Sequence, residues 1–186
     1  MLAKSEIRSI NKIRRSSMEM VEVRNKSFAA TREFLSSEIY KNAGEIMLYM
    51  PIYNEIDTAG IMKAAIDEGK KVVLPVTDKG SGSITPYYVA KDTKFVKGAF
   101  SVAEPYGATV VDPPKIDVVL LPGIAFDLSG NRVGFGKGCY DRFLENSKAI
   151  KIGFCYHFQI SEEIEAEGHD IKMDFLLTEK GLIKCK

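Results

Sequence analysis

A glycine-rich segment with a lysine inside it is the part of this sequence best suited to chemistry. It reads 121-LPGIAFDLSGNRVGFGKGCYDRFL-144, with Gly134, Gly136 and Gly138 at alternate positions and Lys137 between the last two. Glycines let backbone N–H groups approach a phosphate closely, and a following helix start would add unpaired N–H donors. Lys137 adds a full positive charge, and Asp141, one turn into that helix, could hold a divalent cation. The spacing predicts a phosphate-binding loop.

The segment matches neither of two common nucleotide-binding patterns. A Walker A loop has its first glycine five positions before the Gly-Lys pair and a Ser or Thr after it. Here Gly130 lies one residue too far upstream, and Gly138 occupies the hydroxyl position. A Rossmann fingerprint needs glycine at 139, where the chain has Cys139. From this segment alone, a tight turn with a solvated lysine stays open as the simpler alternative.

The elements that would position the loop alternate between strand and helix. Almost wholly apolar runs predict strands buried on both faces, as in parallel sheets. The apolar runs cover residues 45–50, 71–76, 116–123, 151–157 and 173–178. A further strand is predicted at 83–89. Asp57 as N-cap and Gly69 as stop predict one helix, and another is expected over about 137–146. The order predicts a three-layer α/β/α fold with a mostly parallel central sheet, and ligands bind beyond the carboxyl ends of such strands.

The N-terminal segment of the chain has a net positive charge. Residues 4–15 read as a helix, and Ser16 and Glu19 have the spacing of a capping box that begins a second one. The buried stripe of that second helix is predicted to be Met20, Val23, Ser27, Ala30 and Phe34. Residues 1–32 hold eight Lys/Arg and three Asp/Glu, whereas the remainder holds eighteen and twenty-two. This +5 segment beside a −4 body predicts an anionic ligand nearby. We expect one domain, 1–186, with basic helices (about 4–36) packed on an α/β body.

Composition excludes several classes of protein. The three cysteines, Cys139, Cys155 and Cys185, form no CxxC and no Cys/His cluster, so neither a disulfide framework nor a zinc site is indicated. No run approaches the ~20 apolar residues of a membrane span, and the N-terminus lacks an apolar signal core. We expect a cytoplasmic monomer. The non-enzymatic alternative, a nucleic-acid-binding module, is disfavoured by the net charge of +1 and the lack of a binding signature.

The glycine segment resembles the signature of the 5-formyltetrahydrofolate cyclo-ligase family, also called 5,10-methenyltetrahydrofolate synthetases. That signature runs Pro-Gly, an apolar pair, Phe-Asp, a turn glycine, Arg-Leu-Gly and Gly-x-Gly-Tyr-Tyr-Asp. Other pieces agree in order along nearly the whole chain: Lys4 and Arg8, Glu-Ile-Asp-Thr at 55–58, and Asp170 with Asp174.

The resemblance implies an activity. The family uses ATP and magnesium to close the 5-formyl group of a reduced folate onto N10, giving 5,10-methenyltetrahydrofolate, ADP and phosphate. Phosphorylation of the formyl oxygen, attack by N10 and loss of phosphate would need positioning and charge stabilisation more than a catalytic triad. The enzymatic alternative is another enzyme on this kind of fold, a sugar-phosphate isomerase or acyl-CoA transferase, which would bind phosphate without hydrolysing ATP.

The resemblance also implies a site, carried over position by position. Lys137 and Arg132 are the expected catalytic residues, with Lys137 stabilising the transferred phosphoryl group. ATP is expected to contact Lys4, Ser5, Glu6, Ile7, Arg8, Arg132, Val133, Gly134, Phe135, Gly136, Lys137, Gly138, Cys139 and Tyr140. The folate is expected to contact Met50, Glu55, Phe135, Gly136, Lys137, Gly138 and Cys139. Magnesium is expected on Asp141 and Asp170, with Asp174 as a rival to Asp170. Phe126, Phe135 and Tyr140 are candidates for aromatic walls around a flat heterocycle.

Two positions depart from the family signature. Val133 replaces the usual Leu, a conservative change. Cys139 replaces the usual Tyr, which leaves one aromatic contact open and places a thiol beside the phosphates. The family mechanism needs no thiolate, so Cys139 is not expected to be catalytic. A helix N-terminus favours the reactive thiolate form, and we therefore expect sensitivity to alkylation.

Overall fold

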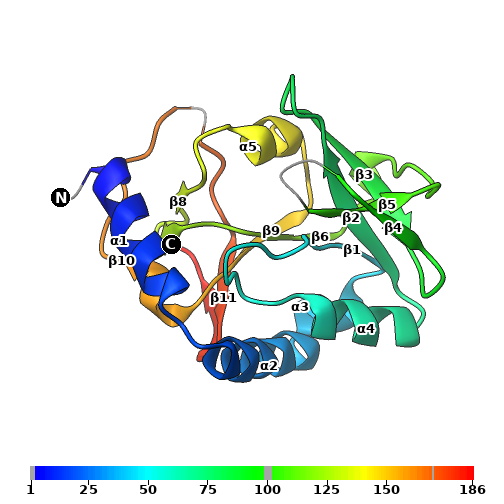
Figure 1. Cartoon of the computed structure of the whole chain (residues 1–186), viewed down its shortest axis with the longest axis horizontal. Helices are drawn as coiled ribbons and strands as arrows, with labels where there is room; N and C mark the ends of the chain where they lie inside the picture. Colours follow the sequence, from blue (N-terminus) through cyan, green and yellow to red (C-terminus); the bar gives the residue numbers. More distant parts are fainter. Residues whose placement is uncertain (1–2, 99–101, 169) are drawn as a thin grey trace.

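A seven-stranded sheet forms the centre of the computed structural model, which describes residues 3–98, 102–168 and 170–186 (Figure 1). The strand order is β12-β11-β9-β6-β1-β2-β3. The bounds are β1 Glu45–Met47, β2 Lys71–Thr77, β3 Ile84–Val89, β6 Val118–Leu121, β9 Ile150–Phe154, β11 Phe175–Thr178 and β12 Gly181–Lys184. All pairs from β11 to β2 are parallel, and only the edge strands β3 and β12 pair antiparallel. The predicted α/β fold with a mostly parallel sheet is confirmed.

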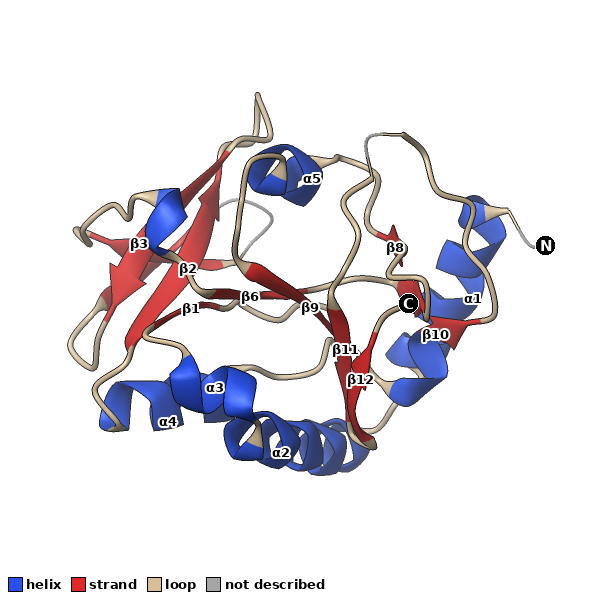
Figure 2. Ribbon diagram, turned by 180° about the vertical axis from the view of Figure 1, so that it is seen from behind, coloured by secondary structure: helices blue, strands red, loops and turns tan. Residues whose placement is uncertain are grey.

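Helices cover both faces of this sheet. Figures 1 and 2 show α2, α3 and α4 on one face and α5 on the other. These helices are α2 Met20–Ser36, α3 Glu38–Asn42, α4 Ala59–Asp67 and α5 Cys139–Leu144. Side chains alternate between the two faces: Ile46 packs in the core on the α2 side, and Met47 packs in the core on the α5 side. The buried stretches of the central strands are therefore apolar at successive positions, as in β6, which is why their sequence shows no alternation.

Smaller elements complete the fold at its two ends. At one end, α1 (Lys4–Ser16) buries Ile7 against a three-stranded sheet, ordered β10-β7-β8. At the other end, β4 and β5 form a hairpin. The remaining bounds are β4 Lys94–Lys97, β5 Ala103–Tyr106, β7 Ala125–Asp127, β8 Arg132–Val133, β10 Ile160–Ser161, and the 3₁₀ turns Pro113–Lys115 and His157–Gln159. Sequence patterns predicted none of these short strands.

Several predicted local details are wrong. Ser16 does not cap α2, because its hydroxyl donates to the Ile13 carbonyl and the N-cap residue is Glu19. Met20 is 68% exposed, so it does not belong to the buried stripe of α2. Thr58 is the N-cap of α4, although Asp57 still accepts a hydrogen bond from the Ala59 amide at 2.8 Å. The glycine-loop helix is also shorter than predicted, with six residues.

The topology places a crevice at one point of the sheet edge. The chain runs from β1 outward to β2 and β3 and then returns to the other side of β1 as β6. The connections leaving β1 and β6 therefore diverge to opposite faces, and ligands in open α/β sheets bind at such a switch point. No helix among the described residues is both long and apolar enough to cross a membrane.

Candidate active site

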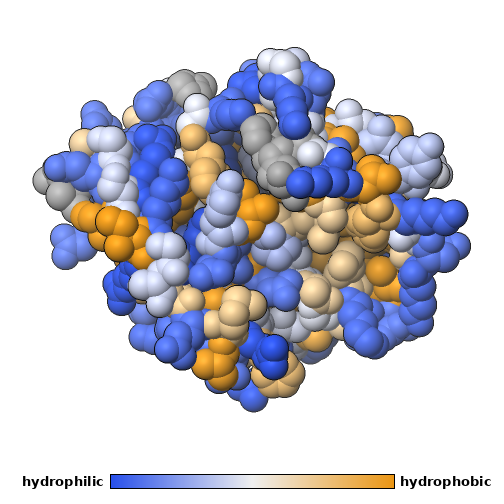
Figure 3. All heavy atoms as spheres, in the orientation of Figure 1, coloured by the Kyte–Doolittle hydropathy of each residue, from blue (hydrophilic) through white to orange (hydrophobic). Residues whose placement is uncertain are grey.

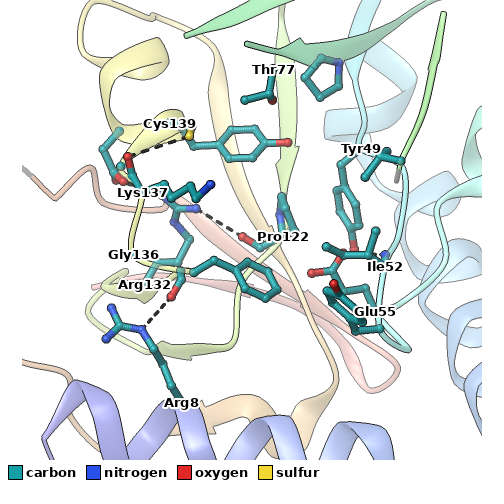
Figure 4. Close-up of a pocket in the computed structure, with 18 of the residues that line it drawn as sticks. Arg8, Tyr49, Ile52, Glu55, Thr77, Pro122, Arg132, Gly136, Lys137 and Cys139 are labelled. Atoms are coloured by element: carbon teal, nitrogen blue, oxygen red, sulfur yellow. Dashed lines mark hydrogen bonds and ion pairs between the residues drawn. The ribbon is translucent and has the colours of Figure 1, made fainter. Parts of the chain in front are cut away.

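A cleft of about 590 Å³ opens at the switch point between β1 and β6. Its walls come from α1, the segment after β1, the ends of β2 and β6, β5, the glycine loop and the loop before β11. Figure 4 shows Arg132, Gly136 and Lys137 on one side and Tyr49, Ile52 and Glu55 on the other. The predicted residues that line it are Lys4, Arg8, Met50, Glu55, Arg132, Gly134, Phe135, Gly136, Lys137, Gly138, Cys139, Tyr140, Asp141 and Asp170.

The glycine loop exposes backbone donors to this cleft. Gly136 and Gly138 have φ of +92° and +61°, values that side-chain-bearing residues rarely adopt. Within the described part of the chain, no hydrogen bond uses the amides of Phe135, Gly136 or Gly138. Unpaired amides beside Lys137 fit an anion. The six-residue α5 is too short to carry this interaction, so the loop itself supplies the donors.

Helix α1 brings two cations to the same cleft. Arg8 donates from Nε to the Gly134 carbonyl at 2.9 Å, which ties the helix to the start of the glycine loop. Lys4 pairs with Glu167 at 2.8 Å and Asp170 at 2.9 Å. Against the opposing effect of burial, these hydrogen bonds raise the pKa of Lys4 above its ordinary value. The N-terminal positive charge therefore lies at the glycine loop, although 126 residues separate Arg8 from Gly134 in sequence.

Asp141 and Asp170 lie in one wall of the cleft, and each is paired with a cation. Arg132 Nη2 donates to both Asp141 oxygens at 2.9 and 3.0 Å, while Asp170 pairs with Lys4. The Ile171 amide also donates to Asp141 at 3.3 Å, which ties the Asp170 loop to Asp141. Among the described residues, no group of three or more His, Cys, Asp or Glu side chains forms a metal cage. Two carboxylates fit magnesium, which takes few protein ligands together with water and phosphate oxygens.

Arg132 is buried in the wall of the cleft and bonds through both terminal nitrogens. Its side chain is 7% exposed, Nη1 donates to the Pro122 carbonyl at 3.3 Å, and Nη2 is held by Asp141. The buried Nε has no partner among the described residues. A buried donor without a partner costs stability.

Glu55 and Arg15 form a buried ion pair at the base of the cleft. Their side chains are 5% and 3% exposed, and Arg15 Nη1 lies 3.4 Å from Glu55 Oε1. Burial raises the pKa of Glu55 to about 7, with Arg15 and the Ile52 amide opposing the shift. Arg15 also donates to the carbonyls of Tyr53, at 2.9 Å, and Gly123, at 3.4 Å. It therefore joins the segment after β1 to the end of β6.

Some predicted residues contribute no lining side chain. Ile7 and Val133 pack together where α1 meets the small sheet. Glu6 accepts from the Ala3 amide at 2.8 Å, and Ser5 is exposed outside the cleft. Phe126 is fully buried in the core, so it forms no cleft wall.

The rival carboxylate Asp174 lies outside the cleft. It pairs with Lys151 at 3.3 Å and lines a second pocket, which contains none of the other predicted site residues. The position of Asp170 in the cleft wall therefore supports it over Asp174 as the second metal-binding candidate.

Sequence reasoning missed several lining residues. Tyr49, Ile52, Tyr53, Pro75, Thr77, Val102, Glu104, Pro122 and Glu167 also line the cleft. Tyr53 lies in a turn directly after the first predicted strand, where position at the carboxyl end of a parallel strand was an available signal. The burial of Arg15 had no such signal, because an arginine near the end of a basic helix reads as solvated.

Comparisons with known proteins agree along the whole chain. The model of the 5-formyltetrahydrofolate cyclo-ligase family matches residues 1–179. The 5-formyltetrahydrofolate cyclo-ligase of Mus musculus is 25% identical, over 95% of this chain and 94% of its own length. That of Mycolicibacterium smegmatis is 31% identical, over 76% of this chain and 77% of its own.

Solved structures share the fold. The 5,10-methenyltetrahydrofolate synthetase of Aquifex aeolicus has a TM-score of 0.89 and 34% identity, covering 100% of this chain and 94% of that one. A synthetase of the same name from Mycoplasma pneumoniae, at 22% identity, has a TM-score of 0.77 over 96% of this chain and 99% of its own. The protein described here belongs to the 5-formyltetrahydrofolate cyclo-ligase family.

Proposed function

We propose that this protein converts 5-formyltetrahydrofolate to 5,10-methenyltetrahydrofolate, with ATP giving ADP and phosphate. The observation that carries the proposal is the meeting of three features in one cleft: the cations of α1, the unpaired amides of the glycine loop and the buried carboxylate of Glu55. The cations of α1 and the loop amides suit a polyphosphate. The Glu55 carboxylate suits the N–H edge of a pteridine ring, which donates hydrogen bonds to a carboxylate.

In the proposed mechanism, different parts of the cleft bind the phosphates and stabilise the transferred phosphoryl group. Lys4, Arg8 and the loop amides bind the phosphates, and Lys137 stabilises charge on the phosphoryl group as it moves to the formyl oxygen. N10 then attacks the formyl carbon. The carbon–oxygen bond breaks, the oxygen leaves as part of inorganic phosphate, and the N10 proton goes to solvent or phosphate. The protein's share of the catalysis is orientation and electrostatic stabilisation.

Asp141 and Asp170 would hold magnesium beside the phosphates. Bound there, the ion would neutralise charge on the transferred group. The pairing of Asp141 with Arg132 and of Asp170 with Lys4 keeps both carboxylates oriented at the cleft wall. Arg132 is then a positioning residue, because it holds Asp141 beside the phosphates.

A coupled assay tests the proposal. Pure protein with ATP, magnesium and 5-formyltetrahydrofolate should produce the near-ultraviolet absorbance of the methenyl product, with one ADP and one phosphate per product. Omitting ATP should abolish the signal. A protein that binds ATP but gives no absorbance rise would refute the cyclo-ligase activity. Turnover of a phosphorylated sugar without ATP would favour the isomerase alternative.

A further inference from the structure

Two exposed aromatic rings stand at the mouth of the cleft. Tyr53 is 72% exposed and Phe135 is 44% exposed, and both contribute to its lining. Their ring centroids are 6.4 Å apart and their planes are tilted by 50°, so neither ring covers the other face to face. On the face drawn in Figure 3, apolar residues are interspersed with hydrophilic ones. Exposed rings beside a cleft are typical of a ligand-binding surface.

The chain holds Tyr53 at this position by specific contacts. Tyr53 and Asn54 both have left-handed backbone conformations, with φ of +50° and +56°. Two successive non-glycine residues in this region are strained, and such strain persists only where surrounding contacts impose it. Arg15 binds the Tyr53 carbonyl at 2.9 Å, and the Asn54 side chain donates to the carbonyls of Arg15 and Met18, each at 3.2 Å. The backbone that carries the ring is therefore tied to the end of α1.

Lys12 lies next to the Phe135 ring, at the solvent-exposed rim of the cleft. Its Nζ lies 5.4 Å from the centroid of the Phe135 ring, while Arg15 Cζ lies 5.9 Å from the same centroid. Lys12 is exposed and has no carboxylate partner among the described residues. From the inside outward, the order is the buried Glu55–Arg15 pair, then the Phe135 and Tyr53 rings, then the cation of Lys12.

We propose that Tyr53, Phe135 and Lys12 form the binding site for the aromatic acyl-glutamate half of the folate, an inference that rests on the proposed function above. A reduced folate contains a pteridine, a p-aminobenzoyl ring and a glutamate, in that order. A pteridine against Glu55 would place the benzoyl ring at the two aromatic side chains and the glutamate carboxylates near Lys12. The chemical order of the ligand thus matches the order of groups from the base of the cleft, past the two rings, to Lys12 beside Phe135 at its rim.

The test measures KM for two substrates in matched variants. One substrate is 5-formyltetrahydrofolate; the other is 5-formyltetrahydropteroyl amide, which keeps the pteridine, N10 and the benzoyl ring but carries no carboxylate. Tyr53→Ala should raise KM for both substrates about tenfold, the scale of a lost aromatic contact. Lys12→Met should raise KM about threefold for the folate alone, because an exposed ion pair is weak. In both variants kcat and KM for ATP should stay at wild-type values.

Three controls separate the site from general damage. Tyr53→Phe keeps the ring and should retain wild-type KM. Phe28→Ala and Lys148→Met remove an exposed ring and an exposed lysine outside the cleft, and both should leave KM unchanged. Wild-type KM in both Tyr53→Ala and Lys12→Met, with an active wild-type protein, would overturn this site and leave the proposed function standing. An inactive wild-type protein would overturn both.

Discussion

Replacing Glu55 with glutamine should remove a pH dependence from the stability of this protein. Burial raises the pKa of Glu55 from 4.5 to about 7, even though Arg15 lies 3.4 Å away and opposes the shift. The folded chain therefore holds the Glu55 proton more tightly than the unfolded chain. The stabilisation from that proton is complete below about pH 4.5 and is lost as the pH rises through about 7.

The size of the effect follows from the shift. One pKa unit corresponds to about 1.4 kcal/mol, so the full shift is worth about 3 kcal/mol. Roughly 2.5 kcal/mol of this falls between about pH 5 and pH 8. Because glutamine does not titrate, Glu55→Gln should become more stable relative to the wild type by this amount over that range.

Urea unfolding of both proteins at about pH 5 and pH 8 measures this difference, since titrations shared by the two chains cancel. Glu163→Gln, which changes an exposed glutamate, is the matched control and should show no pH-dependent difference from wild type. A Glu55→Gln stability difference that is the same at both pH values would refute the claim that Glu55 is held in a desolvated site.

The same group should control substrate binding. In the proposed complex, the ionised form of Glu55 would accept hydrogen bonds from pteridine N–H groups, whereas the protonated form would offer a competing donor. KM for 5-formyltetrahydrofolate should therefore fall as the pH rises through about 7, and the dependence should be absent in Glu55→Gln. Steady-state kinetics at saturating ATP measures it.

Three further predictions concern the phosphate side of the cleft. Lys137→Ala should lower kcat at least ~10²-fold, the cost of losing a preorganised transition-state donor, and near-wild-type turnover at saturating ATP would contradict its role. Arg8→Ala should raise KM for ATP about tenfold or more, because it removes a cation and the hydrogen bond to Gly134; an unchanged KM would exclude α1 as a nucleotide contact. Iodoacetamide should modify Cys139 before Cys155 and Cys185, since burial raises the pKa of both others, that of Cys185 to about 11, and ATP should slow the modification, as read by peptide mass spectrometry.

The sequence predicted the central sheet well because its signal is local. A strand buried on both faces is apolar at each position, as at 118–121, and this pattern needs no knowledge of which strands are its neighbours. The glycine loop was equally readable, because Gly136 and Gly138 report a backbone conformation that few other residues adopt. The short strands β4, β5, β7, β8, β10 and the edge strand β12 were missed, since two to four residues carry too little pattern.

The tertiary structure decided which charged residues lose their contact with water. Arg15 and Glu55 are 40 residues apart, and nothing in either local sequence distinguishes them from solvated side chains. Their burial arises because α1 packs against the turn after β1 and the end of β6, and only that packing removes water from the pair. The local sequence thus determined where the chain forms strands and where the glycine loop turns. The long-range fold determined which carboxylate is desolvated, because desolvation depends on every segment that surrounds a group and not on its neighbours in the chain.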